Sequence, residues 1–197
     1  MKKALLIVDV QNDFCPGGAL AVPEGDKVVP TLNRYIELFS KKSFPIFASR
    51  DWHPEKTRHF KEFGGLWPEH CVQGTKGAEF HPGLLLPENT IVVSKGMDPD
   101  KDSYSVFEAF DFQGRRFDDI LRSMGIVELY VGGIATDYCV KESVLDALKK
   151  GFKINLLIDA VKGVDEAQSR RAIEKMLSLG AEKKKFEEVV KELSRFC

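Results

Sequence analysis

The stretch VELYVGGIATDYCVKESVLDALKKG, from Val127 to Gly151, decides the fold. It begins with an apolar run typical of a buried strand, passes through two glycines and ends in a helical pattern, with Gly151 where a left-handed C-terminal residue is expected. Either Thr136 or Asp137 can cap that helix. Its apolar face is formed by Val140, Val144, Ala147 and Leu148. The stretch therefore predicts a strand that turns directly into a helix.

Cys139 lies where this strand turns into the helix. The first turn of a helix offers unpaired backbone N–H groups and the positive end of the helix dipole, and both favour a thiolate. Its position therefore makes Cys139 a candidate nucleophile. The alternative is an inert packing cysteine, because free cysteines are among the most buried residues. This segment alone leaves both open.

Other reactive side chains also follow strand-like runs. A short buried strand is expected in ALLIVDV and ends near Asp9. A second strand is expected in TIVVSKG and has Lys95 at its end. FPIFASRDWH places Asp51 and His53 just past a third strand. Because chemistry in open α/β sheets gathers at the carboxyl ends of strands, we expect these residues to meet at one edge of the sheet. Taken singly, Asp9 could be a turn carboxylate and Lys95 a solvated lysine.

The whole chain alternates strand-like and helical patterns. Strands are expected near residues 4–9, 44–49, 90–94, 126–131 and 153–158, and helices near 26–42, 115–124, 138–150 and 165–179. This alternation predicts an α/β fold of three layers, α/β/α, with a mostly parallel sheet of about six strands. The length of 197 residues and the 43% hydrophobic content suit a single domain over residues 1–197.

Charge and cysteine content argue against several classes of protein. The formal net charge is -1 and no basic block appears, which argues against nucleic acid or a membrane as a partner. No apolar run is long enough to span a bilayer and no cleavage pattern follows the basic start, so we expect a cytoplasmic protein. Without CxxC spacing we expect reduced thiols, with Cys15 and Cys71 as packing and Cys197 exposed or disordered. The oligomeric state stays open, a homo-oligomer included.

The segment 52–89 interrupts the alternation and is rich in Gly, Pro, His and aromatic residues. Long irregular insertions of this kind are usually functional. Asp51 and His53 are two apart in an extended stretch and point the same way, and His70 can complete a metal-binding set. Such a set suits Zn²⁺, Fe²⁺ or Mn²⁺ and leaves coordination positions open. His59 can add a ligand. The alternative is that these are ordinary surface-loop histidines.

Several short blocks occur together in this chain: DVQNDF, DWHP, PEHC, SKG, DSYSVF and GGIATDYCV. In this order they resemble the nicotinamidase/pyrazinamidase family of the isochorismatase-like cysteine hydrolases, and the resemblance extends from Met1 to about Asp165. It implies the fold of that family. By position it also implies three groups of residues: Asp9, Lys95 and Cys139 as the catalytic set, Asp51, His53 and His70 as metal ligands, and Phe14, Trp67 and Tyr104 as an aromatic substrate pocket.

The resemblance also implies an amidase mechanism. A cis peptide between Ile134 and Ala135 would aim the backbone amides of Ala135 and Cys139 into an oxyanion hole. The helix terminus and Lys95 would favour the thiolate of Cys139, and Asp9 would accept its proton and later donate it to departing ammonia. Attack on a carboxamide would give a thioester, and water, activated by Asp9 or delivered from the metal, would release the acid.

The implied substrate is nicotinamide, with pyrazinamide as a further substrate and NAD salvage as the role. The implied cofactor is one divalent metal ion, with zinc placed first and iron or manganese as alternatives. The metal would hold the pyridine-ring nitrogen and orient the amide, which is a positioning role.

The last strand departs from the pattern of the resembled family, because AEKKKF is mostly charged. We expect a sixth strand that is short or lies at an edge, where lysine discourages aggregation. Three other functions remain as alternatives. A sister amidase or carbamoyl hydrolase would share the catalytic residues, whereas a vinyl-ether hydrolase is disfavoured by Cys139 together with a metal set. A non-enzymatic metal-binding protein on the same fold is disfavoured by the intact set.

Overall fold

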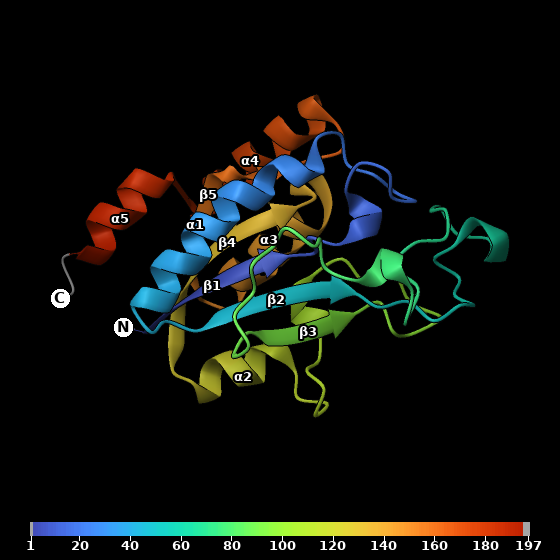
Figure 1. Cartoon of the computed structure of the whole chain (residues 1–197), viewed down its shortest axis with the longest axis horizontal. Coiled ribbons are helices and arrows are strands. Elements are labelled where there is room, and N and C mark those ends of the chain that lie inside the picture. The colour runs from blue at the N-terminus through green and yellow to red at the C-terminus, as the bar shows by residue number, and fades with distance from the viewer. Residues whose placement is uncertain (1, 195–197) are drawn as a thin grey trace.

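The computed structural model describes residues 2–194 and contains a parallel sheet of six strands (Figure 1). The strands are β1 (Lys2–Val8), β2 (Ile46–Asp51), β3 (Ile91–Lys95), β4 (Ile126–Ile134), β5 (Lys153–Lys162) and β6 (Glu182–Lys184). Their order across the sheet is β3-β2-β1-β4-β5-β6, and every neighbouring pair is parallel. The predicted parallel sheet of about six strands is thus confirmed.

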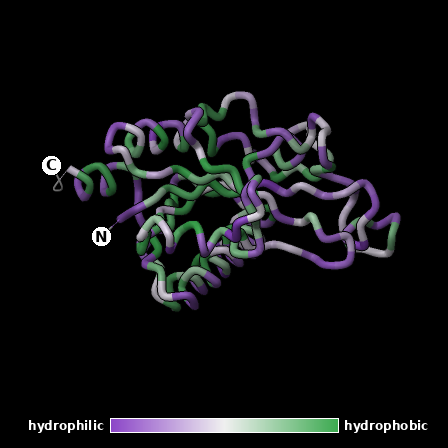
Figure 2. The backbone as a smooth tube through the Cα atoms, turned by 90° about the horizontal axis from the view of Figure 1, so that it is seen from below, coloured by the Kyte–Doolittle hydropathy of each residue, from purple (hydrophilic) through white to green (hydrophobic). Residues whose placement is uncertain are grey.

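Helices cover both faces of the sheet. One face packs against α1 (Val28–Lys41) and α5 (Phe186–Ser194), and the other against α2 (Phe117–Ser123), α3 (Lys141–Lys149) and α4 (Glu166–Ser178). Alternate residues of a strand point to opposite faces, so Leu6 of β1 joins the core under α2, α3 and α4, while Leu5 joins the core under α1 and α5. This explains why β1 is a continuous apolar run. Figure 2 shows the apolar residues gathered along the strands and the inner sides of the helices.

Most expected elements are present, with shifted bounds. The strand expected at 153–158 extends to Lys162, and the strand expected at 44–49 runs from Ile46 to Asp51, so Asp51 is the last residue of β2 and does not follow it. The charged AEKKKF segment forms a three-residue strand at the sheet edge, as expected. The C-terminal helix α5 was not expected, because its buried residues Val189 and Leu193 form only a short apolar stripe in a highly charged segment.

The insertion 52–89 connects β2 to β3, and its only helical elements are short 3-10 turns at Lys61–Phe63 and Lys76–Ala78. Further 3-10 turns lie at Asn12–Phe14, Gly25–Lys27 and Val106–Glu108. Of the residues from 2 to 194, none belong to a helix long and apolar enough to cross a membrane. The expected position of Cys197 lies outside the described residues.

The strand order places a crevice between β1 and β4. From β1 the chain continues to β2 on one side, whereas β4 continues to β5 on the other, so the connections diverge at this point. Asp9 follows β1 directly, and the segment leading to Cys139 follows β4. Gly133 permits the close packing of these two strands, because a Cβ there would lie 2.1 Å from the carbonyl oxygen of Val8 and its φ is +122°. The candidate site therefore begins at this crevice.

Candidate active site and metal centre

Cys139 lies in a single π-helical turn, Thr136–Val140, between β4 and α3. The peptide bond between Ile134 and Ala135 is cis, as expected. The expected cap is wrong: Ala135 occupies the N-cap position and no side chain caps the turn. The carboxylate of Asp137 instead accepts hydrogen bonds from the backbone N–H groups after β5, at Val164 and Asp165, each at 3.0 Å. Asp137 thereby ties the cysteine turn to the next loop of the sheet.

The helix after Cys139 otherwise has the predicted form. Val140 and Val144 are fully buried, Ala147 is nearly so, and Leu148 packs against the same core. The residue expected to be left-handed at the end of the helix, Gly151, has φ +86°. Packing on this face fixes the helix against the sheet, and with it the position of the thiol.

Lys95 lies at the centre of the predicted catalytic set. Its ammonium nitrogen is 2.9 Å from Asp9 Oδ2 and 3.4 Å from Cys139 Sγ, and it also forms an ion pair with Asp51 Oδ1. The other oxygen of Asp9 accepts a hydrogen bond from Ser49 Oγ at 2.7 Å. Asp9 and Lys95 are 0% and 1% exposed. The structure thus brings the three expected residues together in a site shielded from water.

Sequence analysis missed Ser49, although the spacing contained a signal for it. Ser49 and Asp51 are two residues apart in β2, so both side chains point to the same side of the sheet. A hydroxyl in this position can hold one carboxylate oxygen of Asp9 while Lys95 holds the other.

The charge state expected for Cys139 is wrong for the resting site. Burial raises the pKa of its thiol well above the ordinary value, and although Lys95 opposes this, Asp9 adds to it. Burial also raises the pKa of the Asp9 carboxyl, against the opposing effect of Lys95. Lys95 stays charged: burial alone would lower its pKa, but Asp51 and Asp9 outweigh burial and raise it. The resting site therefore holds the neutral thiol of Cys139 beside the charged ammonium of Lys95 and the Asp9 carboxyl, whose pKa is raised.

The three expected metal ligands converge on one point. Asp51 Oδ2 lies 3.6 Å from His53 Nε2 and 3.9 Å from His70 Nε2. The Nδ1 atoms of both rings face backbone carbonyls, that of Gly96 at 2.9 Å and that of Pro68 at 2.7 Å. A carbonyl only accepts, so each Nδ1 carries the hydrogen and each Nε2 presents a lone pair. His53 Nε2 is buried and has no hydrogen-bond partner, which suits a lone pair that can coordinate a cation.

His59 lies in the same cluster as His53 and His70. Its ring stacks on His53 with centroids 4.6 Å apart, and His53, His59 and His70 each offer a ring nitrogen within 4.8 Å of the others. Burial lowers the pKa of His59, and it lowers that of His70 to about 4, so both rings are neutral near pH 7, as ligands must be.

Asp102 is a second residue that sequence analysis missed. Its carboxylate accepts a hydrogen bond from His59 Nδ1, which leaves the Nε2 of that ring for a metal. Asp102 begins the block DSYSVF, whose tyrosine was already expected in the pocket, but the separation of 43 positions between His59 and Asp102 hides the pair from any local pattern.

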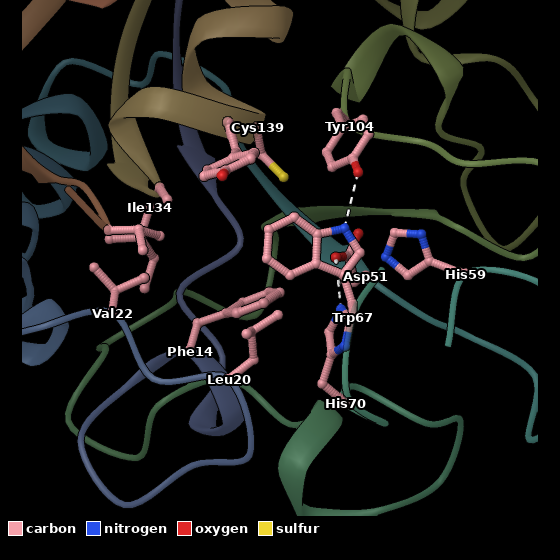
Figure 3. A pocket seen from close by; sticks show the side chains of 13 residues that line it. Phe14, Leu20, Val22, Asp51, His59, Trp67, His70, Tyr104, Ile134 and Cys139 are labelled. Atoms are coloured by element: carbon pink, nitrogen blue, oxygen red, sulfur yellow. Dashed lines mark hydrogen bonds and ion pairs between the residues drawn. The ribbon is translucent and has the colours of Figure 1, made fainter. Parts of the chain in front are cut away.

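A pocket with an empty volume of about 440 Å³ lies between the thiol and the histidines (Figure 3). All three expected aromatic residues line it: Phe14, Trp67 and Tyr104. Trp67 Nε1 donates a hydrogen bond to Tyr104 Oη at 2.9 Å, and the Trp67 ring meets the Tyr138 ring edge-on at 5.2 Å. Tyr138, next to the nucleophile candidate, was not expected there. Thiol, aromatic walls and metal ligands therefore face one cavity.

Comparisons with known proteins agree with this arrangement. The isochorismatase domain family matches residues 3–188. Nicotinamidase of Escherichia coli (strain K12) is 44% identical and aligns over 91% of this chain and 92% of that protein. Pyrazinamidase of Pyrococcus horikoshii in complex with zinc has a TM-score of 0.88 at 49% identity, covering 94% of this chain and 100% of that one. PnC1 from L. infantum in complex with nicotinate has a TM-score of 0.85 at 35% identity, covering 95% and 94%.

Proposed function

We propose that this chain, which belongs to the isochorismatase domain family, hydrolyses nicotinamide to nicotinic acid and ammonia. The observation that carries the proposal is the pocket: the thiol of Cys139, which contacts the buried Lys95 ammonium, lines an aromatic cavity that His59 and His70 line as well. Pyrazinamide also carries a carboxamide with a ring nitrogen in the meta position, so we expect it to be hydrolysed as well. A role in NAD salvage follows from the product.

The first chemical step is attack by Cys139. As Sγ bonds to the carboxamide carbon, the thiol proton moves to Asp9, and the carbonyl π electrons move to oxygen. Because the resting thiol is neutral, proton transfer accompanies attack. The Lys95 ammonium contacts both Sγ and Asp9, so it stabilises the negative charge that passes between them. We propose that the backbone N–H groups of Ala135 and Cys139 hold the oxyanion.

The second step releases ammonia. The tetrahedral carbon loses its C–N bond, and Asp9 gives the proton that it accepted to the departing nitrogen. A thioester on Cys139 remains. A water molecule then loses a proton to Asp9 while its oxygen bonds to the thioester carbon, the C–S bond breaks, and Asp9 returns the proton to sulfur. Asp9 therefore alternates between base and acid, for which its raised pKa is suited.

The aromatic residues fix the ring of the substrate. Phe14 and Trp67 offer flat apolar surfaces, and the hydrogen bond from Trp67 to Tyr104 holds two of the walls in a fixed relation. A flat heteroaromatic amide held between such walls presents its carboxamide to the thiol in a restricted set of orientations.

A divalent metal ion fits the cluster of Asp51, His53 and His70, and we propose His59 as a further ligand. When bound, the ion supplies an electrophilic partner for the ring nitrogen and so positions the substrate. Zinc is proposed, because imidazole and carboxylate suit it, with iron and manganese as alternatives. The chain supplies the ligand orientation through the carbonyls of Gly96 and Pro68.

The test is ammonia release from nicotinamide by the purified protein, with nicotinic acid identified as the product. Benzamide serves as the matched comparison because it lacks only the ring nitrogen. We expect nicotinamide and pyrazinamide to be hydrolysed well and benzamide poorly. No ammonia from nicotinamide, in a folded and metal-loaded sample, would contradict the proposal; equal rates on benzamide would remove ring-nitrogen recognition from it. A single domain, a cytoplasmic location and a homo-oligomer stay predictions.

A further inference from the structure

Three potential metal ligands surround the Lys95 ammonium. Asp9 Oδ2 lies 2.9 Å from Lys95 Nζ, Cys139 Sγ lies 3.4 Å from it, and Asp51 Oδ1 forms an ion pair with it. Asp9, Asp51 and Cys139 each offer a donor atom within 4.8 Å of the others, and all three residues are buried. Apart from its ion pair with Lys95, Asp9 Oδ2 has no hydrogen-bond partner. The ammonium is thus the cation that this donor set holds.

The same donors would hold a metal ion. Two carboxylates and a cysteine sulfur form a mixed set that suits Zn²⁺ and, through the sulfur, the softer Cd²⁺. The set also borders the histidine cluster, because Asp51 turns Oδ1 toward Lys95 and Oδ2 toward His53. The Asp51 carboxylate would therefore connect a metal ion bound by the histidines to a second set of donors that includes the Cys139 sulfur.

We infer that the Lys95 ammonium occupies a latent metal site and so keeps divalent ions away from Cys139. Its charge neutralises one carboxylate of the set, and its covalent tether keeps it there at any metal concentration. A divalent ion would have to displace a buried ammonium that repels it. Lys95 thus has a protective role besides its role in proton transfer, because a sulfur whose lone pair is bound to a metal ion is a weaker nucleophile than a free thiolate. The consequence for catalysis rests on the proposed function, but the metal binding itself does not.

Removal of the ammonium should open the site. In Lys95→Ala, two buried carboxylates lose their common cation, and the space of the lysine side chain becomes free. A Cd²⁺ ion can then bind Asp9, Asp51 and Cys139. In this step the S–H bond breaks, the proton leaves to solvent and a sulfur–cadmium bond forms, so no oxidant or reductant is needed.

The experiment is a Cd²⁺ titration of metal-free protein, with bound ions counted by elemental analysis after dialysis and cadmium–thiolate bonds followed by their ultraviolet charge-transfer absorption. We compare the native protein, Lys95→Ala, the double variant Lys95→Ala/Cys139→Ser, and Lys101→Ala. The last removes a lysine whose side chain is 65% exposed and pairs with Glu108, so it is a matched control. Lys95→Ala should bind one equivalent more than the native protein and gain a thiolate band.

Each control has a definite result. The double variant should lose the additional band, which assigns it to Cys139 and separates it from the other cysteines, and Lys101→Ala should behave as the native protein does. A folded Lys95→Ala with the native ion count and no additional band overturns the inference. So does a native protein that shows the Cys139 band. If circular dichroism shows that Lys95→Ala is unfolded, Lys95→Ser leaves similar space and can hydrogen-bond to Asp9. Failure of the nicotinamide assay would leave these ion counts unaffected.

Discussion

Asp51 and Lys95 are directly opposite each other at the carboxyl ends of β2 and β3, and their side chains form an ion pair. The remaining oxygen of Asp51 faces His53 at 3.6 Å. One carboxylate therefore contacts both the histidine cluster and the charged groups around Cys139. Burial alone would raise the pKa of Asp51, but the Lys95 ammonium outweighs it and lowers the pKa, so the shared carboxylate is ionised. A change in charge or ligand binding at the histidines is therefore expected to alter the electrostatic environment of Cys139, and the reverse.

Cys139→Ala should lower the rate of ammonia release by about four orders of magnitude or more, because no other residue of the set can form the acyl intermediate. Cys15→Ala is the matched control, since Cys15 is also a buried free cysteine but lies outside the catalytic set. It should retain activity. Iodoacetamide should inactivate the native enzyme, with nicotinamide protecting. Substantial turnover by Cys139→Ala would exclude the covalent mechanism.

Asp9→Asn and Lys95→Ala should each lower kcat by about two or more orders of magnitude, and the double variant should lose little beyond the worse single variant. The reason is that Lys95 contacts both the base and the sulfur, so the residues act as one unit. The four proteins are compared under metal-limited conditions in single-turnover assays. Losses that add in free energy would indicate independent roles and contradict the coupled proton transfer.

His53→Ala and His70→Ala should lose the metal and raise KM for nicotinamide, with a fall in kcat if ring coordination also orients the amide. About one ion per native chain is expected by elemental analysis. Benzamide hydrolysis, already slow, should hardly change in these variants, because no ring nitrogen is involved. If nicotinamide and benzamide lost activity to the same extent, the histidines would have a structural role.

Asp102→Ala should weaken metal binding by roughly 10- to 100-fold, the usual effect of removing a carboxylate that orients a ligating histidine. The measurement is competition for Zn²⁺ with a chromophoric chelator, and a Co²⁺ spectrum reports any change in coordination. Asp100→Ala is the control, because Asp100 is an exposed acidic residue of the same loop. Equal affinities in the Asp102 variant and the native protein would show that the contact with His59 does not position a ligand.

Acid should weaken the attachment of α5. Burial alone would raise the pKa of Glu192, but hydrogen bonds from Lys3 and Tyr130 outweigh it and lower the pKa to about 2. A lowered carboxyl pKa gives stability that is complete above the unfolded value of about 4.3 and is lost as pH falls toward 2. Glu192→Gln should therefore cost on the order of 2 kcal/mol at pH 7 and much less near pH 2. Urea unfolding at both pH values tests this; a loss independent of pH would exclude the ionised carboxylate as its source.

The sequence by itself determined where the reactive side chains meet. Asp9 and Lys95 follow apolar runs, Asp51 ends one, and parallel strands bring such positions to one edge because every carboxyl end points the same way. The strand-to-helix turn likewise placed Cys139 at the crevice. These predictions succeeded because they depend on local periodicity and on the direction of the chain.

The tertiary structure alone decided the environment of these side chains. His59 lies beside His53 and His70 and donates a hydrogen bond to Asp102 because two loops distant in sequence fold against each other. Asp137, expected to cap a helix, binds the loop after β5 instead. The thiol of Cys139 is neutral because burial and Asp9 outweigh Lys95, and burial and charge distances are properties of the packed chain. Local spacing places a functional group at an edge; its pKa and its partners depend on what packs around it.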